Sequence, residues 1–424
     1  MHEAVRTAAS GQKMENHEVV VVGAGAAGLS SAAALQGRGF QTVVLESSGA
    51  VGARWRSRYE ELRLNSWRAM SNLQGFRMPR SYGRYPRRDD FVAYLEGFVM
   101  HHQLSVRFNT RLLRIERAGD MWRLQTSERQ LLARYVVVAT GWDAVPVLPQ
   151  WPGQEHFSAA LLHSSEFHTA KEYTGKRVLV VGAGNSGIDI AGHLVTAGAH
   201  VELSMRTPPN LARRDILGLP GQPLLVLVAD HLPARLSDLS FSITQRLLFG
   251  DLAPFGLPRA KDGPYANFHR RLRNPAIDDG FVAALKRGKA KVVAEVERLD
   301  GPAVLLADGT QLCPDAVICA TGYRRGLEDI VGHLGVLGAD GVPVAYHGAP
   351  EHPAAPRLYF AGMWGQFSGE IRLGPRHARR IARAASRDRA NTTTVRVPPR
   401  SNRRSSCGFR DPDRQLMVAP VPCH

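Results

Sequence analysis

Cysteine is scarce in this sequence, with Cys313, Cys319, Cys407 and Cys423 among 424 residues. None of them forms a C-x-x-C pair or a zinc-ligand spacing, and four cysteines in a chain of this length do not make a disulfide framework. The sequence therefore predicts no metal site, and its cysteine content is typical of a protein of the reducing cytoplasm.

Long apolar runs are also missing. No stretch reaches the ~18 uninterrupted apolar residues that a membrane-spanning helix needs. The segment from Met1 to His17 lacks the apolar core of a signal peptide. We therefore expect no transmembrane segment. Met14 lies just ahead of the first predicted strand, so residues 1–16 are predicted to be a flexible N-terminus, with either Met1 or Met14 as the true start.

Acidic residues are few beside basic ones, because 38 Asp and Glu stand against 54 Lys and Arg, for a net charge of +16. Much of the excess lies in Arg379–Arg389 and Arg396–Arg414. No helix-turn-helix, RNP-like or zinc-finger pattern accompanies it, so we expect no specific nucleic-acid partner. Attraction to anionic cofactors or surfaces is the simpler interpretation. Residues 389–424 are predicted to be a disordered basic tail.

Glycine, by contrast, is abundant and clusters at strand-to-helix turns. The first such turn is Gly23-Ala-Gly25-Ala-Ala-Gly28, between a buried strand at Glu18–Val22 and an alanine-rich helix; a second strand, Gln41–Leu45, ends in Glu46. In such a βαβ unit the first glycine makes the tight turn and the second lets backbone N–H groups approach a pyrophosphate. The third lets helix and strand pack closely.

The same unit occurs a second time. A strand at Arg177–Val181 leads into Gly182-Ala-Gly184-Asn185-Ser186-Gly187, a helix at Ile188–Thr196 and a strand at Val201–Met205. Two such units predict two dinucleotide-binding sites in one chain. The alternative for each loop is a purely structural glycine-rich turn.

The residue 23 positions beyond the first glycine differs between the two loops. After the first loop it is Glu46, whose carboxylate can accept from both ribose hydroxyls, as FAD or NAD requires. After the second loop it is Met205, flanked by Ser204 and Arg206, and a hydroxyl with a guanidinium suits a 2′-phosphate. We therefore predict FAD at the first loop and NADPH at the second. The alternative for Arg206 is an ordinary exposed arginine.

These units predict an α/β fold with two Rossmann-like, doubly wound dinucleotide-binding domains, the FAD domain being interrupted by an inserted NADPH domain. The FAD domain is assigned residues 17–150 and 316–388, and the NADPH domain residues 151–315, with a helical substrate or lid segment at 208–280. For the apolar stretch from Ile216 to Phe255 three interpretations stay open: a lid over the substrate, plain core, or a membrane-associating surface.

Other elements are expected between these units. A helix from Asp89 to His102 would be capped by Asp89 or Asp90. Hairpin-like strands are predicted from Val106 to Tyr135, with a separate buried strand at Val136–Ala139. A helix at Arg376–Ala385 would close the ordered chain.

Two dinucleotides in one chain predict hydride transfer from a nicotinamide to a flavin. Flavoprotein disulfide reductases share this layout but need a redox cysteine pair beside the flavin. No cysteine follows Glu46 until Cys313, and Cys313 and Cys319 lie at the wrong place and spacing. Oxygen or an external acceptor is therefore expected to take the electrons.

One stretch carries a specific resemblance. Phe157-Ser-Ala159-Ala-Leu-Leu-His163-Ser-Ser-Glu-Phe167 matches the F-x-G-x-x-x-H-x-x-x-[YF] signature of the flavin-containing monooxygenases, with Ala159 in place of the glycine. The sequence resembles this family from about Val19 to Ala385, and within it the YUCCA branch and its bacterial relatives, to which Phe249–Leu257 looks most similar. The resemblance implies that His163 is a domain-linking and positioning residue; direct acid–base chemistry is the alternative.

Further motifs resemble the same family. Ala139-Thr140-Gly141 and Ala320-Thr321-Gly322-Tyr323 are similar to its two A-T-G strand ends, and Gly52-Ala53-Arg54-Trp55 to its flavin-side G-G-x-W, with Ala53 as a departure. Phe360-Ala-Gly362 followed by Ser368-Gly369 resembles the strand that passes under the flavin. The loops and the resemblance together assign FAD contacts to Gly23, Gly25, Gly28, Glu46, Trp55, Thr140, Gly141 and Gly362, and NADPH-side contacts to Gly182, Gly184, Asn185, Ser186, Gly187, Ser204, Arg206 and Thr321.

Asn65 is the one side chain to which the resemblance assigns a catalytic role. It falls where flavin-containing monooxygenases carry an asparagine beside the flavin, which implies a hydrogen bond that steadies the C4a-hydroperoxide. Plant YUCCA proteins tend to carry another residue there, so this position leaves the substrate branch open. The alternative is a turn asparagine without a catalytic role.

The resemblance implies an NADPH- and O2-dependent FAD monooxygenase that forms a C4a-(hydro)peroxyflavin, the cofactor carrying the hard chemistry. It would oxygenate a nitrogen or sulfur of a small organic substrate, or decarboxylate a 2-oxo acid such as an aryl-pyruvate. Two alternatives remain: an FAD-dependent NADPH oxidase or dehydrogenase without oxygen transfer, and a basic binding protein with a vestigial Rossmann fold. A homodimer is also left open.

Overall fold

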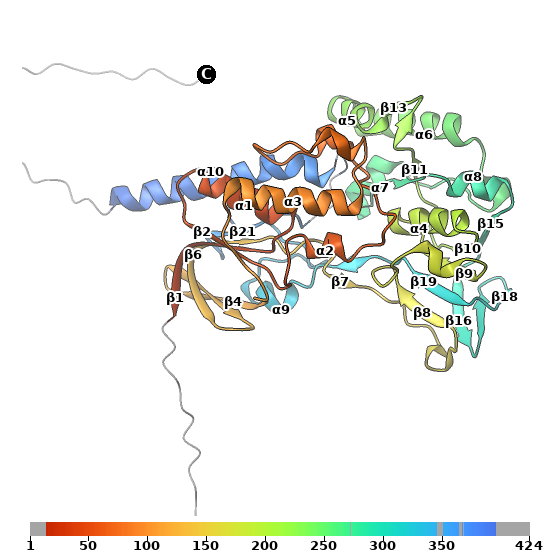
Figure 1. Cartoon of the computed structure of the whole chain (residues 1–424), viewed down its shortest axis with the longest axis horizontal. Coiled ribbons are helices and arrows are strands. Elements are labelled where there is room, and N and C mark those ends of the chain that lie inside the picture. The colour runs from red at the N-terminus through yellow and green to blue at the C-terminus, as the bar shows by residue number, and fades with distance from the viewer. Residues whose placement is uncertain (1–13, 272, 346–350, 364–366, 368, 396–424) are drawn as a thin grey trace, which may run out of the picture. The chain divides into compact units, whose positions relative to one another are not determined.

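The computed structural model describes residues 14–395, except 272, 346–350, 364–366 and 368 (Figure 1). The chain up to Ser386 clusters into one compact unit, and the residues from Arg387 onward form a second. Most of the predicted N-terminus and of the predicted basic tail, with Cys407 and Cys423, lies outside the described residues, as does Ser368. No helix among the residues described is both long and apolar enough to cross a membrane.

The first sheet is built around a valine-rich central strand whose last four residues, Val19–Val22, are buried. Five of its seven strands pair in parallel, and two more continue it as an antiparallel meander. Its order is β3 (Val106–Arg107), β2 (Thr42–Leu45), β1 (Glu15–Val22), β6 (Gln130–Val138), β5 (Met121–Thr126) and β4 (Leu112–Ala118), with β21 (Leu358–Phe360) pairing with β6.

The predicted boundary between a hairpin ending at Tyr135 and a separate buried strand is wrong. One continuous nine-residue strand, β6, covers the end of the predicted hairpin and most of the predicted buried strand. Its first half pairs antiparallel with β5, while its whole length runs parallel to β1. A strand that is half meander and half Rossmann core shows a mixed burial pattern, which is why the sequence suggested two elements.

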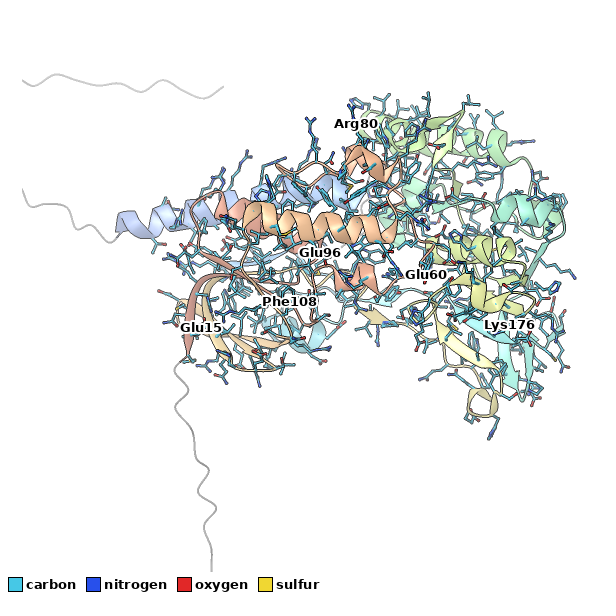
Figure 2. The ribbon with its side chains drawn as sticks, in the orientation of Figure 1. Glu15, Glu60, Arg80, Glu96, Phe108 and Lys176 are labelled. Carbon is cyan, nitrogen blue, oxygen red and sulfur yellow. The ribbon has the colours of Figure 1, made fainter. Side chains whose placement is uncertain are left out.

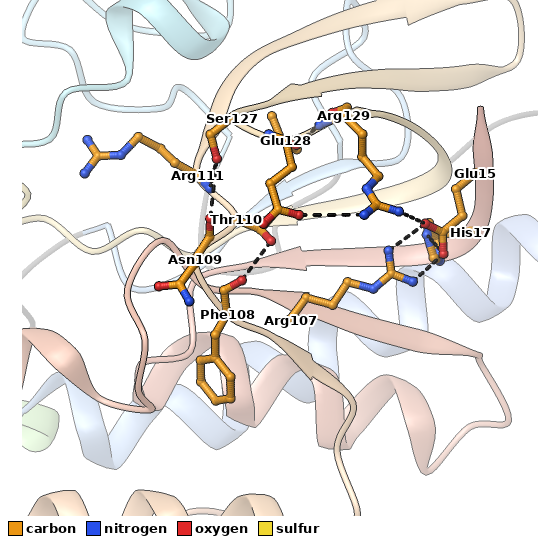
Figure 3. Close-up of polar contacts among 11 residues, drawn as sticks. Glu15, His17, Arg107, Phe108, Asn109, Thr110, Arg111, Ser127, Glu128 and Arg129 are labelled. Carbon is orange, nitrogen blue, oxygen red and sulfur yellow. Dashed lines mark hydrogen bonds and ion pairs between the residues drawn. The ribbon is translucent and has the colours of Figure 1, made fainter. Parts of the chain in front are cut away.

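The predicted flexible N-terminus, residues 1–16, is too long by two residues, because β1 begins at Glu15. The strand itself starts three residues before the predicted Glu18. The Glu15 carboxylate accepts hydrogen bonds from the Arg107 guanidinium and lies 3.8 Å from Arg129 (Figure 3). The hydrogen bond from Arg107 lowers the pKa of Glu15 to about 2. These two arginines, from β3 and from the turn before β6, therefore hold the start of the strand in the sheet.

Three helices share the main core with this sheet: α1 (Ala26–Gln36), α3 (Arg88–His102) and α10 (Glu370–Val395) (Figure 1). The N-cap of α3 is Arg87, not Asp89 or Asp90, and Asp90 instead accepts the Arg87 N–H at 2.9 Å as the third helical residue. Helix α10 is longer at both ends than predicted, so the expected disordered tail from residue 389 begins inside a helix. Arg56 of α2 (Ala53–Arg56) pairs with Glu96 of α3 at 2.6 Å. Glu96 is labelled in Figure 2.

The second sheet is fully parallel and carries the second glycine loop. Strand β19 lies inside it, between two other strands, so the predicted start of the returning FAD domain at residue 316 is wrong. The error arose because each Rossmann unit contains an A-T-G strand end, and sequence alone does not say to which sheet a strand belongs. The order is β15 (Ala290–Val293), β10 (His200–Ser204), β9 (Arg177–Val181), β19 (Ala316–Cys319) and β8 (Ala160–His163).

Helices occupy much of residues 208–280, and Phe249 of this segment packs into the core of the second unit. Its helices are α5 (Gly221–His231), α6 (Ala234–Phe249) and α7 (Pro264–Arg271), preceded by a hairpin of β12 (Asp215–Ile216) and β13 (Leu219–Pro220). In Figure 1 α5, α6 and the hairpin lie together at one edge of the molecule.

Candidate active site

The first glycine loop has the backbone geometry that its spacing predicts. Gly23 has a φ of +107°, which favours glycine. A Cβ on Gly28 would lie 1.9 Å from the Gly23 carbonyl oxygen, so only glycine lets α1 pack here. A Cβ on Gly25 would meet no atom within 4 Å, which leaves an open cradle at the N-terminus of α1. These residues therefore fit the pyrophosphate of a dinucleotide.

The second loop repeats this geometry closely. Gly182 has a φ of +108°, and a Cβ on Gly187 would lie 1.8 Å from the Gly182 oxygen. Gly184 has open space before the N-terminus of α4 (Asn185–Thr196). The two loops are thus equivalent in backbone and differ in the side chains around them.

Glu46 lies at the end of β2 and is bound to the first loop. One carboxylate oxygen accepts the Ala24 N–H at 2.9 Å and the other accepts the Ser48 N–H at 3.0 Å. Glu46 also lines a large cavity beside the loop. The carboxylate is therefore held in place where a ribose would follow the pyrophosphate.

Ser204 and Arg206, predicted to act together on a 2′-phosphate, have different surroundings. The buried Ser204 hydroxyl donates to the Ala294 carbonyl at 2.8 Å, whereas the Arg206 side chain is 74% exposed and lies 3.7 Å from Glu295. Of the two, Arg206 offers its charge to solvent, so it is the better candidate for the phosphate.

The large cavity, of about 1230 Å³, brings most of the predicted flavin side together with the start of α4. Neither Cys313 nor Cys319 is among the described residues that line it. From the predicted site, the lining contains Gly23, Gly25, Glu46, Trp55, Asn65, Thr140, Gly141, Asn185, Ser186 and Gly362, whereas Gly28, Gly182, Gly184, Gly187, Ser204, Arg206 and Thr321 lie outside it.

Asn65 contacts the second dinucleotide unit directly. Its amide nitrogen donates to Asn185 Oδ1 at 3.2 Å, and its Oδ1 accepts from Arg214 at 3.0 Å. Asn185 Oδ1 also accepts the Ile277 N–H at 3.0 Å, and its nitrogen donates to the Pro275 carbonyl at 3.1 Å. Both amides therefore lie on the cavity wall in orientations that these hydrogen bonds define.

Arg214 was missed by the sequence analysis, although it organises this wall. Its side chain is only 7% exposed, pairs with Asp279 and lies 3.8 Å from Asp189. Burial lowers the pKa of Arg214, and the Asp189 charge opposes this shift. The hydroxyl of Tyr59 in turn donates to Asp189, which joins the segment after α2 to α4.

A second missed cluster lies on the flavin side of the cavity. Arg58 donates to the Asp143 carboxylate and to the Tyr323 hydroxyl. Burial alone would lower the pKa of Arg58, but the charge of Asp143 and the contact with Tyr323 outweigh it, and the pKa is raised. This arginine thereby links both A-T-G strand ends, since Asp143 follows the first and Tyr323 ends the second. No periodic or motif signal marks either arginine as special.

His163 lies outside the cavity lining and is almost fully buried. Its Nε2 lies 3.0 Å from the Gly322 carbonyl oxygen and its Nδ1 lies 2.9 Å from the Ser165 hydroxyl. Burial lowers its pKa. Phe167 is fully buried in the core of the second unit, and Phe157 packs on the core beside it. This placement favours a positioning role over acid–base chemistry.

Three further predicted cofactor contacts, Trp55 and Gly362 on the flavin side and Thr321 on the NADPH side, have structural contacts of their own. Trp55 packs edge-on against Phe91, with ring centroids 4.6 Å apart. Gly362 has a φ of +68°, and a Cβ there would lie 2.6 Å from the Ala27 side chain. The Thr321 hydroxyl donates to the Val147 carbonyl.

The helical segment contributes apolar side chains to the cavity wall. The inner faces of α5 and α6 and the start of α7 present the largest of these groups. They are Leu224, Leu225, Val228, Phe241, Leu248 and Tyr265, with Phe367 beside them.

Comparisons with known proteins agree with this architecture. Residues 20–216 match the pyridine nucleotide-disulphide oxidoreductase family. The chain is 35% identical over 322 residues to the indole-3-pyruvate monooxygenase YUCCA1 of Oryza sativa subsp. japonica, covering 75% of this chain and 79% of the relative. It is 32% identical over 334 residues to the probable indole-3-pyruvate monooxygenase YUCCA7 of Arabidopsis thaliana, covering 75% and 78%.

Solved structures show the same fold. A flavin-containing monooxygenase from Stenotrophomonas maltophilia superposes with a TM-score of 0.68 at 25% identity, covering 88% of this chain and 99% of that one. OTEMO in complex with FAD and NADP gives a TM-score of 0.69 at 17% identity, covering 90% and 86%, and supports the fold alone. The two cradles, the cavity between them and these relatives together show that the chain belongs to the flavin-containing monooxygenase family, FAD-dependent oxidoreductases that use NADPH.

Proposed function

We propose that this protein is an NADPH- and O2-dependent monooxygenase of a small, largely apolar organic substrate. The observation that carries the proposal is the cavity of about 1230 Å³, in which a flavin-side cradle, the start of α4 and an apolar wall meet around Asn65. The family membership and the names of the relatives support it.

FAD would lie along the first loop, with its pyrophosphate on the Gly25 cradle and its ribose near Glu46. NADPH would lie along the second loop, with its pyrophosphate at Gly184 and its 2′-phosphate near Arg206. When bound, the flavin supplies the redox chemistry and the activation of oxygen.

The chain's own side chains orient groups and exclude water. Asn65 would present an amide to the reacting centre in an orientation set by Asn185 and Arg214. The apolar wall formed by α5, α6 and α7 would keep water out of the chamber in which the bound flavin would supply its chemistry. In this account no protein side chain needs to act as a strong acid or base.

For the substrate, we propose an aromatic 2-oxo acid before an amine or a sulfide. The names of relatives at 30–35% identity support this choice. The aromatic part of the wall, Phe241, Tyr265 and Phe367, suits a planar ring.

The test is an oxygen balance on the FAD-loaded protein with NADPH. Aryl-pyruvates, amines and sulfides are each offered under ¹⁸O2, and labelled product, hydrogen peroxide and consumed NADPH are measured together. We expect label in the product of one substrate class, with little peroxide, and more peroxide from Asn65→Ala at an unchanged rate of flavin reduction. If all consumed NADPH appears as peroxide for every class, the protein is an oxidase. Absence of bound flavin would contradict both functions.

A further inference from the structure

The outward face of α6 is apolar and exposed, opposite the face that lines the chamber. Leu236, Leu239, Ile243 and Leu247 are 51%, 57%, 53% and 81% exposed. Their spacing of three, four and four residues places them on one side of the helix. None of the four lines the cavity, whose α6 contribution comes from residues such as Phe241 and Leu248.

The apolar surface continues onto the neighbouring hairpin and helix, which lie at the same edge in Figure 1. Leu217 and Leu219 of the hairpin are 96% and 69% exposed, and Leu227 of α5 is 58% exposed. Leu217 also has a φ of +50°, an unfavourable conformation for leucine. Soluble surfaces seldom gather this many exposed leucines in one place, so the cluster indicates a contact surface.

The charges on α6 select the kind of partner. Its exposed side chains are the four apolar ones, Ala234, Arg235 and Arg246. The one acid of the helix, Asp238, is directed inward and accepts the N–H groups of Tyr265 and Ala266. On α5 the side chain of Asp230 lies outside the described residues.

A second copy of this chain fits the pattern poorly. If two α6 helices packed antiparallel about their middle, Arg235 of one would stand opposite Arg246 of the other, and like charges facing each other are destabilising. An apolar face with arginines at both ends is instead typical of helices that lie in the interface of an anionic bilayer. The net charge of +16 adds attraction to such a surface.

We propose that the outer face of α6, defined as Arg235, Leu236, Leu239, Ile243, Arg246 and Leu247, together with the Leu217–Leu219 hairpin tip, docks on the surface of an anionic lipid bilayer. The helix lies in the plane of the interface, with its leucines among the acyl chains and its arginines at the headgroups. The opposite face of the same helix then places the substrate chamber directly behind the membrane surface.

The experiment is co-sedimentation of the full-length flavoprotein with vesicles. Vesicles of phosphatidylglycerol and phosphatidylcholine are compared with vesicles of phosphatidylcholine alone, at low and at physiological salt. Wild type is expected to bind the anionic vesicles, more weakly as salt rises. Arg235→Gln with Arg246→Gln should weaken binding by about fivefold for each arginine removed. Leu239→Ser with Leu247→Ser should weaken it by at least about tenfold, because those apolar groups leave the acyl region.

Matched controls remove an exposed apolar side chain or an exposed arginine elsewhere on the protein, which separates the contribution of the α6 face from a general change in surface hydrophobicity or charge. Met100→Ser, at a 74% exposed position on α3, and Arg298→Gln, at a 50% exposed side chain in β16 (Val296–Asp300), should bind as wild type does. Flavin content and NADPH oxidation should be unchanged in every variant, which shows that each one folds. Failure of wild type to bind, or binding that the leucine pair leaves unchanged, would overturn the proposal. So would a dimer in sedimentation equilibrium that the leucine pair dissociates, because the face would then be a subunit interface.

Discussion

At the scale of single residues, the glycines of the second loop separate helix packing from cofactor binding. A methyl group on Gly187 would lie 1.8 Å from the Gly182 oxygen, whereas one on Gly184 would meet no atom within 4 Å. Gly187→Ala is therefore expected to destabilise the fold by ~1–3 kcal/mol, as overpacking does. Gly184→Ala should leave the melting temperature unchanged.

The same Gly184→Ala variant should raise the KM for NADPH by about tenfold, since its methyl group would occupy the space that a pyrophosphate needs. Thermal melting and steady-state kinetics check the pair together. Gly25→Ala offers the corresponding test of the first loop, read out as FAD content. An unchanged KM in Gly184→Ala would remove the second loop from the NADPH site.

A buried carboxyl group at the start of α10 gives the protein a specific pH dependence. Both oxygens of Glu370 are buried and accept no hydrogen bond from the described residues, and Oε1 lies 3.9 Å from His377 Nδ1. Burial raises the pKa of Glu370 from 4.5 to about 8. Burial also lowers the pKa of His377 to about 4, with Arg380 and Arg376 adding to the shift. Near neutral pH both groups are therefore uncharged.

Because the folded protein holds the Glu370 proton more tightly than the unfolded chain, this group favours folding most below pH 4.5. That contribution is lost as the pH rises toward 8. Glu370→Gln keeps a neutral side chain of the same shape, so its stability relative to wild type should rise between pH 5 and pH 8. A few kcal/mol is the expected size, at ~1.4 kcal/mol per pKa unit. Urea denaturation of both proteins at pH 5 and pH 8 measures the difference between their free energies of unfolding. The same difference at both pH values would contradict the raised pKa of Glu370.

At the scale of elements, one carboxylate joins helices α6 and α7 of the helical segment. The Asp238 oxygens of α6 accept the N–H groups of Tyr265 at 2.7 Å and Ala266 at 3.2 Å, in the first turn of α7. Asp238 thus caps a helix other than its own. Asp238→Ala should lower stability by about 1 kcal/mol.

The same change should also raise the KM for the organic substrate, because Tyr265 lines the chamber. Flavin reduction by NADPH should stay as in wild type. Asp238→Asn, which keeps one acceptor oxygen, serves as the matched control and should restore much of the loss. An unchanged KM in Asp238→Ala would show that movement of α7 does not affect binding of the organic substrate.

At the scale of the whole molecule, Arg214 connects the two dinucleotide-binding units. It contacts Asn65 from the flavin-side segment, Asp189 from α4, and Asp279 before α8 (Phe281–Lys286). Arg214→Met would leave two carboxylates without their cation, which typically costs ~3–5 kcal/mol. It would also free one side of the Asn65 amide, so more of the consumed NADPH should appear as hydrogen peroxide.

The yield of hydrogen peroxide per NADPH and urea denaturation test this expectation. Arg214→Met combined with Asp189→Asn should recover part of the lost stability, because one uncompensated charge is removed with its partner. If the double variant is as unstable as the single one, the Asp189 contact does not contribute. Arg298→Met, at a half-exposed arginine of β16 in the same unit, is the control for loss of one positive charge.

Sequence by itself determined the two cradles, because each depends on neighbouring residues. The φ values near +107° at Gly23 and Gly182 and the close contacts of Gly28 and Gly187 follow from local spacing between a strand and a helix. The family signature around His163 and the helical character of the segment within residues 208–280 were predictable for the same reason, since each lies within one continuous stretch.

Only the tertiary structure determined which side chains meet at the wall of the cavity. Asn65 and Asn185 are 120 positions apart, and Arg58 meets a tyrosine 265 positions away. Strand β19 joins the second sheet, although its sequence fits either sheet. Hydrophobic spacing repeats along one chain and predicts local elements, but which elements become neighbours is decided by packing across the whole fold. The roles of Arg214, Arg58 and the exposed leucines of α6 could therefore be inferred only from the tertiary structure, which shows their neighbours.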